Sequence, residues 1–208
     1  MKMASSSLLP LWGMVAVVFL VASCGISPSP RFYTLTSITS PAPVNAEAEP
    51  KKNWSLTIGS IEIPDYLDRP EIVTRAKENQ LVLSEFDLWG GSLKADIGRV
   101  LTENISALLE NHGVRVSGDK ISRQGTYRFY AVINRFEADT EGRVVLKAQW
   151  SLQRINDAVP VFFEDFNVTK PSKGRGYGEV VSAMSEALWE LSKNVAGGLE
   201  SLSSRENK

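Results

Sequence analysis

Residues 143–153 alternate between apolar and polar side chains more regularly than any other part of the sequence. The apolar set occupies the even positions of this run: Val144, Leu146, Ala148, Trp150 and Leu152. Successive side chains of a β-strand point to opposite faces of the sheet, so the run predicts a strand with one buried face and one wet face. A strand of this kind is typical of a sheet that is covered on one face only.

Shorter runs of similar character predict further strands, with turn-forming residues between them. We expect strands at 31–38, 54–63, 71–75, 81–85, 126–136 and 159–169. Gly59 and Ser60 shift the apolar phase within one of these runs, as a β-bulge would. Two polar segments, 77–80 and 139–142, predict tight turns that pair the strands on either side of them.

Two longer segments have the 3.6-residue period of an amphipathic helix. Ser92 can cap the first of them, and Gly113 is expected to end it. The second spans roughly 178–202, and a pair of adjacent glycines near its end is expected to weaken it. Residues 54–208 are therefore predicted to form a single α+β domain, a mixed β-sheet with two main helices packed on one face.

The composition excludes several classes of function. The 208 residues carry 23 Lys and Arg against 24 Asp and Glu, so there is no basic excess to neutralise a nucleic acid. The chain has one cysteine, Cys24, and one histidine, His112. A disulfide within the chain and a zinc site of the Cys/His kind are thereby excluded. We expect no metal, no cofactor and no nucleic-acid partner.

The N-terminus has the pattern of a bacterial lipoprotein. Residues 8–22 form an uncharged apolar run that is short for about 30 Å of hydrocarbon and has the length of a signal-peptide core. The run leads into the letters VASC, which resemble a lipobox ending at Cys24. We expect residues 1–23 to be a cleaved lipoprotein signal peptide, and Cys24 to carry a diacylglyceryl thioether and an acyl chain such as palmitate. Two or three such chains anchor a protein durably. The alternative is an ordinary signal peptide or an uncleaved span.

Residues 24–53 would form the lipidated N-terminus of the mature chain. By the usual bacterial sorting rule, Gly25 after the cysteine favours transfer to the outer membrane, with the domain facing the periplasm. The early strand is expected to dock on the domain through Phe32, Tyr33 and Leu35. The Pro/Ala-rich stretch behind it is expected to loop out as a flexible linker.

The sequence offers no residue pattern typical of an enzyme. It contains no G-x-S-x-G elbow, Walker lysine loop or H-E-x-x-H pair. The run KGRGYG at 173–178 lacks the spacing of a dinucleotide-binding loop and favours a mobile loop. Glu164 and Asp165 are adjacent in a predicted strand, so they would point to opposite faces and not act as a pair. We therefore expect no catalytic residue.

Residues 64–75 combine prolines with the side chains that protein interfaces favour. Tyr66, Leu67 and Arg69 supply an aromatic, an aliphatic and a guanidinium group, and Trp89 precedes the first predicted helix. We take these four as candidate partner-binding residues. The alternative carries equal weight: Tyr66 and Leu67 would pack inward, and Arg69 would form a solvated pair with its acidic neighbour.

Three motifs in the stretch 58–109 resemble a known family. They read I-x-I-P-x-Y-L-D-R-P-x-I-V-T-R, L-x-L-S-E-F-x-L-W and L-x-x-D-I-x-R-V-L-x-E-N-I. With the lipobox and the early F-Y-T-L strand, they resemble the ABC-type transport auxiliary lipoproteins over most of the mature chain. One departure is Gly90-Gly91, where the family pattern has bulkier or acidic residues.

The resemblance implies an accessory role in moving lipids between the inner and outer membranes. Such lipoproteins work with an inner-membrane protein whose MCE domains form a tube across the periplasm, and some accompany related ABC transporters. This chain would then dock such a tube from the outer membrane. A homo-oligomeric ring would match a symmetric tube end. Two other functions stay open: a periplasmic lipid-binding carrier, and a lipoprotein activator of a cell-wall synthase.

Overall fold

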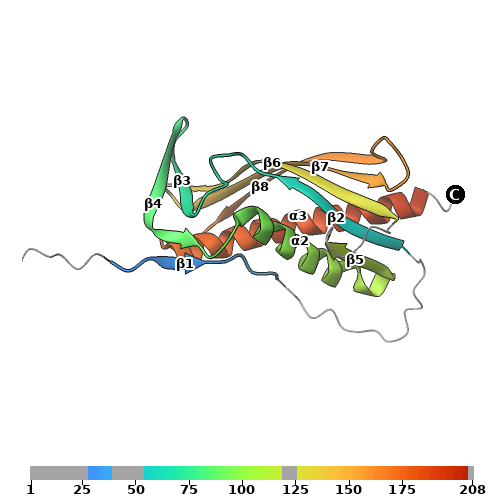
Figure 1. Cartoon of the computed structure of the whole chain (residues 1–208), viewed down its shortest axis with the longest axis horizontal. Helices are drawn as coiled ribbons and strands as arrows, with labels where there is room; N and C mark the ends of the chain where they lie inside the picture. The colour runs from blue at the N-terminus through green and yellow to red at the C-terminus, as the bar shows by residue number, and fades with distance from the viewer. Residues whose placement is uncertain (1–27, 39–53, 119–125, 206–208) are drawn as a thin grey trace, which may run out of the picture.

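The computed structural model describes residues 28–38, 54–118 and 126–205. The expected signal peptide, Cys24 and the Pro/Ala-rich linker lie outside the described residues, so the expectations about them stay predictions. The described part forms the elements labelled in Figure 1: β1 (Arg31–Tyr33), β2 (Trp54–Glu62), β3 (Glu71–Lys77), β4 (Gln80–Trp89), α2 (Leu93–Leu109), a short 3-10 helix (Glu110–His112), β5 (Val114–Gly118), β6 (Tyr127–Asp139), β7 (Arg143–Arg154), β8 (Phe162–Pro171) and α3 (Tyr177–Arg205).

The strands form one mixed sheet of eight strands in which β6 is central. Along one edge of β6 runs β7, antiparallel, and β8 continues the sheet beyond β7. Along the other edge run β2 and, farther on, β3, both parallel to β6. The β3–β4 hairpin is antiparallel, and β1 adds to β4 in parallel. The predicted mixed sheet is confirmed, and so are the hairpin and the β6–β7 turn.

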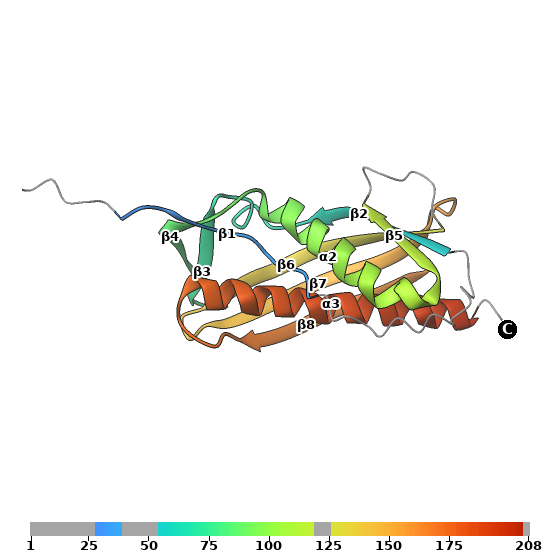
Figure 2. The same ribbon diagram turned by 90° about the horizontal axis from the view of Figure 1, so that it is seen from below.

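Both long helices lie on the same face of the sheet, as Figures 1 and 2 show from two directions. The even-numbered side chains of β7 point to this face and are buried, which confirms the predicted alternation. They pack against α3 and belong to one hydrophobic core with the apolar stripe of α2, which covers β2 and β5. The single α+β domain with two helices on one face is therefore confirmed.

The sequence also indicated correctly where β2 has a bulge and where α2 begins and the helical segment after it ends. The pairing of β2 with β6 shifts register between Ile58 and Ile61, which confirms the bulge. The Ser92 hydroxyl accepts a hydrogen bond from the backbone N–H of Ala95 at 3.3 Å and caps α2. At the other end, Gly113 follows the 3-10 helix with a positive φ of 69°.

The second long helix is not interrupted at its glycine pair. Helix α3 continues through Gly197 and Gly198 to Arg205. A Cβ atom on Gly198 would lie 2.5 Å from Cη2 of the buried Trp150 and 3.3 Å from the ring of Phe162. The glycine is therefore required for the close approach of the indole to the helix, and it does not mark a break.

The two glycines of this pair predict opposite effects on stability. Gly198→Ala should lower the free energy of unfolding by about 1–3 kcal/mol, because the methyl group overpacks against Trp150. Gly197→Ala places its methyl group in open space and should raise the free energy by about 0.5–1 kcal/mol through helix propensity. Urea unfolding of both variants checks this, and a destabilisation of equal size in the two would contradict it.

Candidate partner-binding surface

The loop between β2 and β3 is a tight turn whose residues divide between core and surface. The backbone N–H of Leu67 donates to the carbonyl of Pro64 at 2.9 Å, and the Leu67 side chain is 2% exposed. Trp89, at the end of β4, donates its backbone N–H to the carbonyl of Pro70 at 2.7 Å and is 5% exposed. Of the four candidate residues, Leu67 and Trp89 thus lie in the core. They support the backbone of the surface above them but offer it little side-chain area.

Tyr66 is half-buried, with its hydroxyl directed inward. The hydroxyl donates to Oε2 of Glu137 at 2.9 Å. The Glu137 carboxylate is fully buried and also accepts from Nε of Arg75 at 2.7 Å and Nε of Arg135 at 2.9 Å. Burial, and next the charge of Glu137, raise the pKa of Tyr66 to about 12. This network fixes the loop to β3 and β6, and only part of the Tyr66 ring remains accessible.

Arg69 is partly exposed. Its side chain is 37% exposed, and Nε lies 3.2 Å from Oε2 of Glu71 in an ion pair. Arg69 lines a surface hollow of about 390 Å³, together with the loop and the turn that enters α2. The complete lining is Asp68, Arg69, Pro70, Trp89, Gly90, Gly91, Ser92 and Leu93.

A second hollow of about 270 Å³ lies against the same turn and is also lined by β1 and the first turns of α2. Gly90 donates its N–H to the carbonyl of Tyr33 at 2.8 Å, which joins the turn to β1. A Cβ on Gly91 would meet no atom within 4 Å, so the bulkier residues of the family pattern would project into open space here. We call the surface formed by residues 64–70, 89–92 and 31–34 the N-terminal pole.

Strand β1 docks on the rest of the domain through Tyr33 but not through Phe32. Tyr33 and Arg31 both bind the buried carboxylate of Asp87, at 2.9 and 2.8 Å, and Leu35 beyond the strand is buried in the core. Phe32 is 65% exposed. The expectation that Phe32 packs on the domain is wrong. Arg31 and Tyr33 both point toward Asp87, and alternate residues of a strand share a face, so Phe32 points away from the domain.

The Asp87 carboxylate makes the attachment of β1 dependent on pH. Burial favours its neutral form, but hydrogen bonds from Arg31, Tyr33 and Ser84 outweigh this, so the pKa of Asp87 lies below its ordinary value. Because the pKa of Asp87 is lower in the folded state than the ordinary value of about 3.9, the ionised carboxylate stabilises the fold at pH values above that ordinary value. This stabilisation is lost as the pH falls through the pKa of the folded state.

We predict that Asp87→Asn lowers the urea midpoint at neutral pH and changes it little in strong acid, where the native protein has also lost this charge. Urea titrations of both proteins across this range check the prediction. A gap between the two midpoints that persists unchanged in acid would contradict it.

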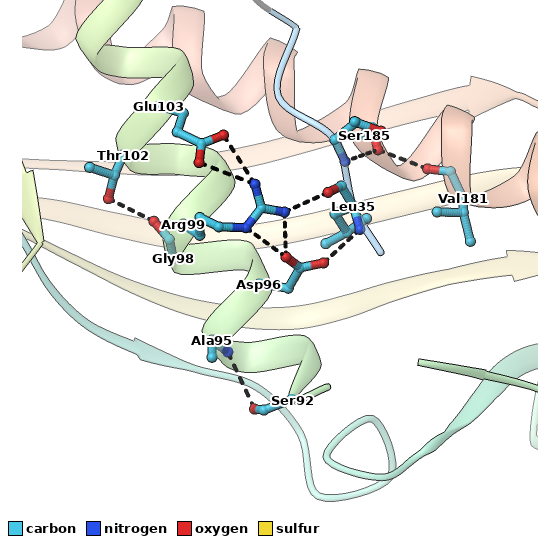
Figure 3. Close-up of polar contacts among 11 residues, drawn as sticks. Leu35, Ser92, Ala95, Asp96, Gly98, Arg99, Thr102, Glu103, Val181 and Ser185 are labelled. Carbon is cyan, nitrogen blue, oxygen red and sulfur yellow. Dashed lines mark hydrogen bonds and ion pairs between the residues drawn. The ribbon is translucent and has the colours of Figure 1, made fainter. Parts of the chain in front are cut away.

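Residues 34–38, which we call the strap, lie between α2 and α3 and are held by side chains of both helices (Figure 3). The Leu35 N–H donates to Oδ2 of Asp96 at 2.6 Å, and the Leu35 carbonyl accepts from Nη2 of Arg99 at 2.6 Å. The Thr36 N–H donates to Oγ of Ser185 at 3.1 Å. The side chain of Asn104 on α2 accepts the N–H of Ile38 at 2.9 Å. Sequence reasoning missed this clamp.

The residues set aside as chemically uninformative are engaged in local contacts. Glu164 accepts from the amide of Asn194 at 2.9 Å, and Asp165 accepts from Gln149 at 2.8 Å on the other face of β8. His112 lies 3.2 Å from Glu200. Across the described ranges, no group of three or more His, Cys, Asp or Glu side chains could hold a metal ion. Neither described helix combines the length and the apolar character that a membrane span needs.

These features define a class: a small α+β domain whose N-terminal strand joins the sheet beside a concave surface, and whose next residues, the strap, are held between its two helices. The chain belongs to the family described as the ABC-type transport auxiliary lipoprotein component, whose model matches residues 33–196. The resemblance carried by the sequence motifs is thereby confirmed. No curated protein matches the chain in sequence.

Solved structures support the fold. A crystal structure of an uncharacterized protein matches with a TM-score of 0.69 at 20% identity, over 83% of this chain and 99% of that one. Protein XCC0632 from Xanthomonas campestris matches with a TM-score of 0.67 at 18% identity, over 85% and 98%. A PelC dodecamer from Paraburkholderia phytofirmans, at 11% identity and a TM-score of 0.39 over 65% and 86%, is too distant to bear on function.

Proposed function

We propose that this chain is an outer-membrane lipoprotein that serves as an accessory subunit of an intermembrane lipid transport system. In this proposal, Cys24 carries the lipid anchor and the domain faces the periplasm. The N-terminal pole docks the end of a periplasmic tube formed by an MCE-domain protein. Membership of the transport auxiliary family supports the accessory role.

The observation that carries the docking site is the position of the two hollows. Both are lined by the turn 89–92, and the smaller one is also lined by β1, through which the chain continues toward Cys24. Arg69 at the rim and the part-exposed ring of Tyr66 supply the guanidinium and aromatic groups that are enriched where partners bind. The buried side chains of Leu67 and Trp89 fix the backbone segments that border the hollow.

The structure gives less support to a lipid-binding carrier. A carrier would hold acyl chains between the sheet and the helices, and large side chains fill this space. Phe129, Trp150, Ile97, Leu188 and Leu191 are each at most 1% exposed. We therefore propose that the domain binds a protein partner and does not enclose a lipid.

A ring of several copies would present the pole symmetrically to a tube end, because closed rings are the natural assembly for head-to-tail contacts. Light scattering of the lipid-free domain, residues 25–208, tests this part of the proposal. A monomer mass that persists at high protein concentration would contradict it.

The docking role is tested by co-purification of the full-length tagged chain from detergent-solubilised membranes. Recovery of an MCE-domain protein is expected, and Arg69→Glu should reduce it strongly. Arg115→Glu is the matched control, because Arg115 is exposed on β5 at the opposite end of the sheet in Figure 1. Equal recovery with both variants would remove the pole from the proposal, and recovery of cell-wall synthases alone would contradict the transport role.

A further inference from the structure

Phe32 is an exposed aromatic side chain near the N-terminus of the described part of the chain. It is 65% exposed on β1, although Tyr33 and Leu35 beside it face the domain. A single exposed apolar side chain is common on protein surfaces, and Phe163 is 61% exposed; what distinguishes Phe32 is its short distance along the chain from Cys24.

The direction of Phe32 is fixed by the contacts of its neighbours. Arg31 and Tyr33 both bind the Asp87 carboxylate, and the Tyr33 carbonyl accepts the N–H of Gly90. Phe32 itself is in register with Leu88 of β4. The phenyl ring therefore projects from an edge strand whose residues on either side of Phe32 are fixed, and it cannot turn inward without breaking these contacts.

The length of chain before the strand limits how far Phe32 can lie from an anchor at Cys24. Pro28, the first described residue, follows Cys24 by four positions, a span of at most about 14 Å when fully extended. Phe32 follows Cys24 by eight positions, at most about 29 Å. The polar layer of one leaflet is roughly 5–8 Å thick, so a tether this short keeps β1 close to the membrane surface.

The charges of this segment also suit a lipid surface. Between Cys24 and Tyr33 there is no acidic residue, and Arg31 is the single charged one. Its side chain is 65% exposed while it pairs with Asp87. A guanidinium beside an aromatic ring is a suitable pair for the headgroup region, where phosphate groups meet apolar chains.

We propose that Phe32 enters the headgroup region of the bilayer that holds the lipid anchor, so that the N-terminal pole faces this bilayer. The inference rests on the lipid anchor of the proposed function. Its consequence is that the hollows beside Tyr33 open next to the membrane surface, and a tube that docks there meets the protein at the point where lipid leaves or enters the bilayer.

The test uses the lipidated full-length chain with one added cysteine, since Cys24 is the only native cysteine and its acylation removes the only free thiol. Phe32→Cys is labelled with the fluorophore NBD. Val159→Cys is the matched control, because Val159 is 69% exposed in the β7–β8 connection, which Figures 1 and 2 place at the end of the molecule opposite β1. Both are reconstituted in phosphatidylcholine vesicles that carry a lipid-borne doxyl quencher near the headgroups.

The label at position 32 is expected to shift its emission to the blue and to be strongly quenched, whereas the label at 159 should behave as in water. If the protein floats with the vesicles and the two labels behave alike, the inference is overturned while the anchor stands. A blue shift at 32 that depends on protein concentration and resists the lipid quencher would overturn it in favour of a second copy. Failure of the native protein to float, with Cys24→Ala behaving identically, would overturn the anchor and the inference together.

Discussion

Replacing Glu137 by leucine is expected to lower the free energy of unfolding by about 3 kcal/mol. The carboxylate is fully buried and neutralises two guanidinium groups, those of Arg75 and Arg135. Without it, two cations that are 19% and 30% exposed would face each other beneath the loop 64–70. Because both retain some solvent, the expected loss lies at the lower end of the range for a broken buried pair. Urea unfolding followed by tryptophan fluorescence measures it.

Tyr66→Phe tests the hydrogen bond between Tyr66 and Glu137 separately from the charge of Glu137. It removes only the hydroxyl that donates to Glu137 and should lower the free energy of unfolding by about 1–2 kcal/mol. If Glu137→Leu were as stable as the native protein, the buried carboxylate would not organise the pole. The loop that carries Arg69 would then not be held in place by this network, and the proposed docking surface would lose its structural support.

Asp96→Ala should release the strap while the domain stays folded. The variant removes the acceptor of the Leu35 N–H and leaves the Arg99 guanidinium with fewer partners. Loss of a hydrogen bond to a charged, mostly buried group corresponds to about 10- to 100-fold more frequent opening. Amide hydrogen exchange of residues 34–38 should rise by this factor, with little change in the strands of the main sheet.

Glu103→Ala is the matched control for the clamp. Glu103 also pairs with Arg99, but both side chains are well exposed, so its removal should cost about 0.5 kcal/mol or less. Exchange in the strap should therefore stay close to that of the native protein. A rise as large as that of Asp96→Ala would show that the orientation of Arg99, and not the acceptor for Leu35, holds the strap.

Most regular elements could be predicted because their signals are periodic and local; β5 was missed, and the strand expected at 31–38 ends at Tyr33. The alternation in β7, the stripes of α2 and α3 and the cap at Ser92 each follow from residues that are neighbours in sequence. The role of Gly198 could not be predicted, because its partner is Trp150, a residue of another element. The low helix propensity of glycine can be read from the sequence, but the close approach of the Trp150 ring to Gly198 cannot.

The candidate surface was harder to predict for two physical reasons. Core and interface favour the same side chains, so residue type alone could not separate the buried Leu67 from an exposed contact. The clamp joins backbone groups of the strap to side chains more than sixty residues away, for which a single sequence has no periodic signal. Phe32 and Tyr33 are adjacent aromatics, and a strand of three residues does not indicate which of them faces inward.

We propose that the N-terminal pole binds an MCE-domain tube. The most direct test of this proposal is a photo-reactive amino acid at position 69 of the full-length chain in living cells, with position 115 as the control, followed by identification of the cross-linked protein. The account predicts an MCE-domain protein captured from position 69 and not from 115. Capture of only cell-wall synthases, or equal capture from both positions, would contradict it.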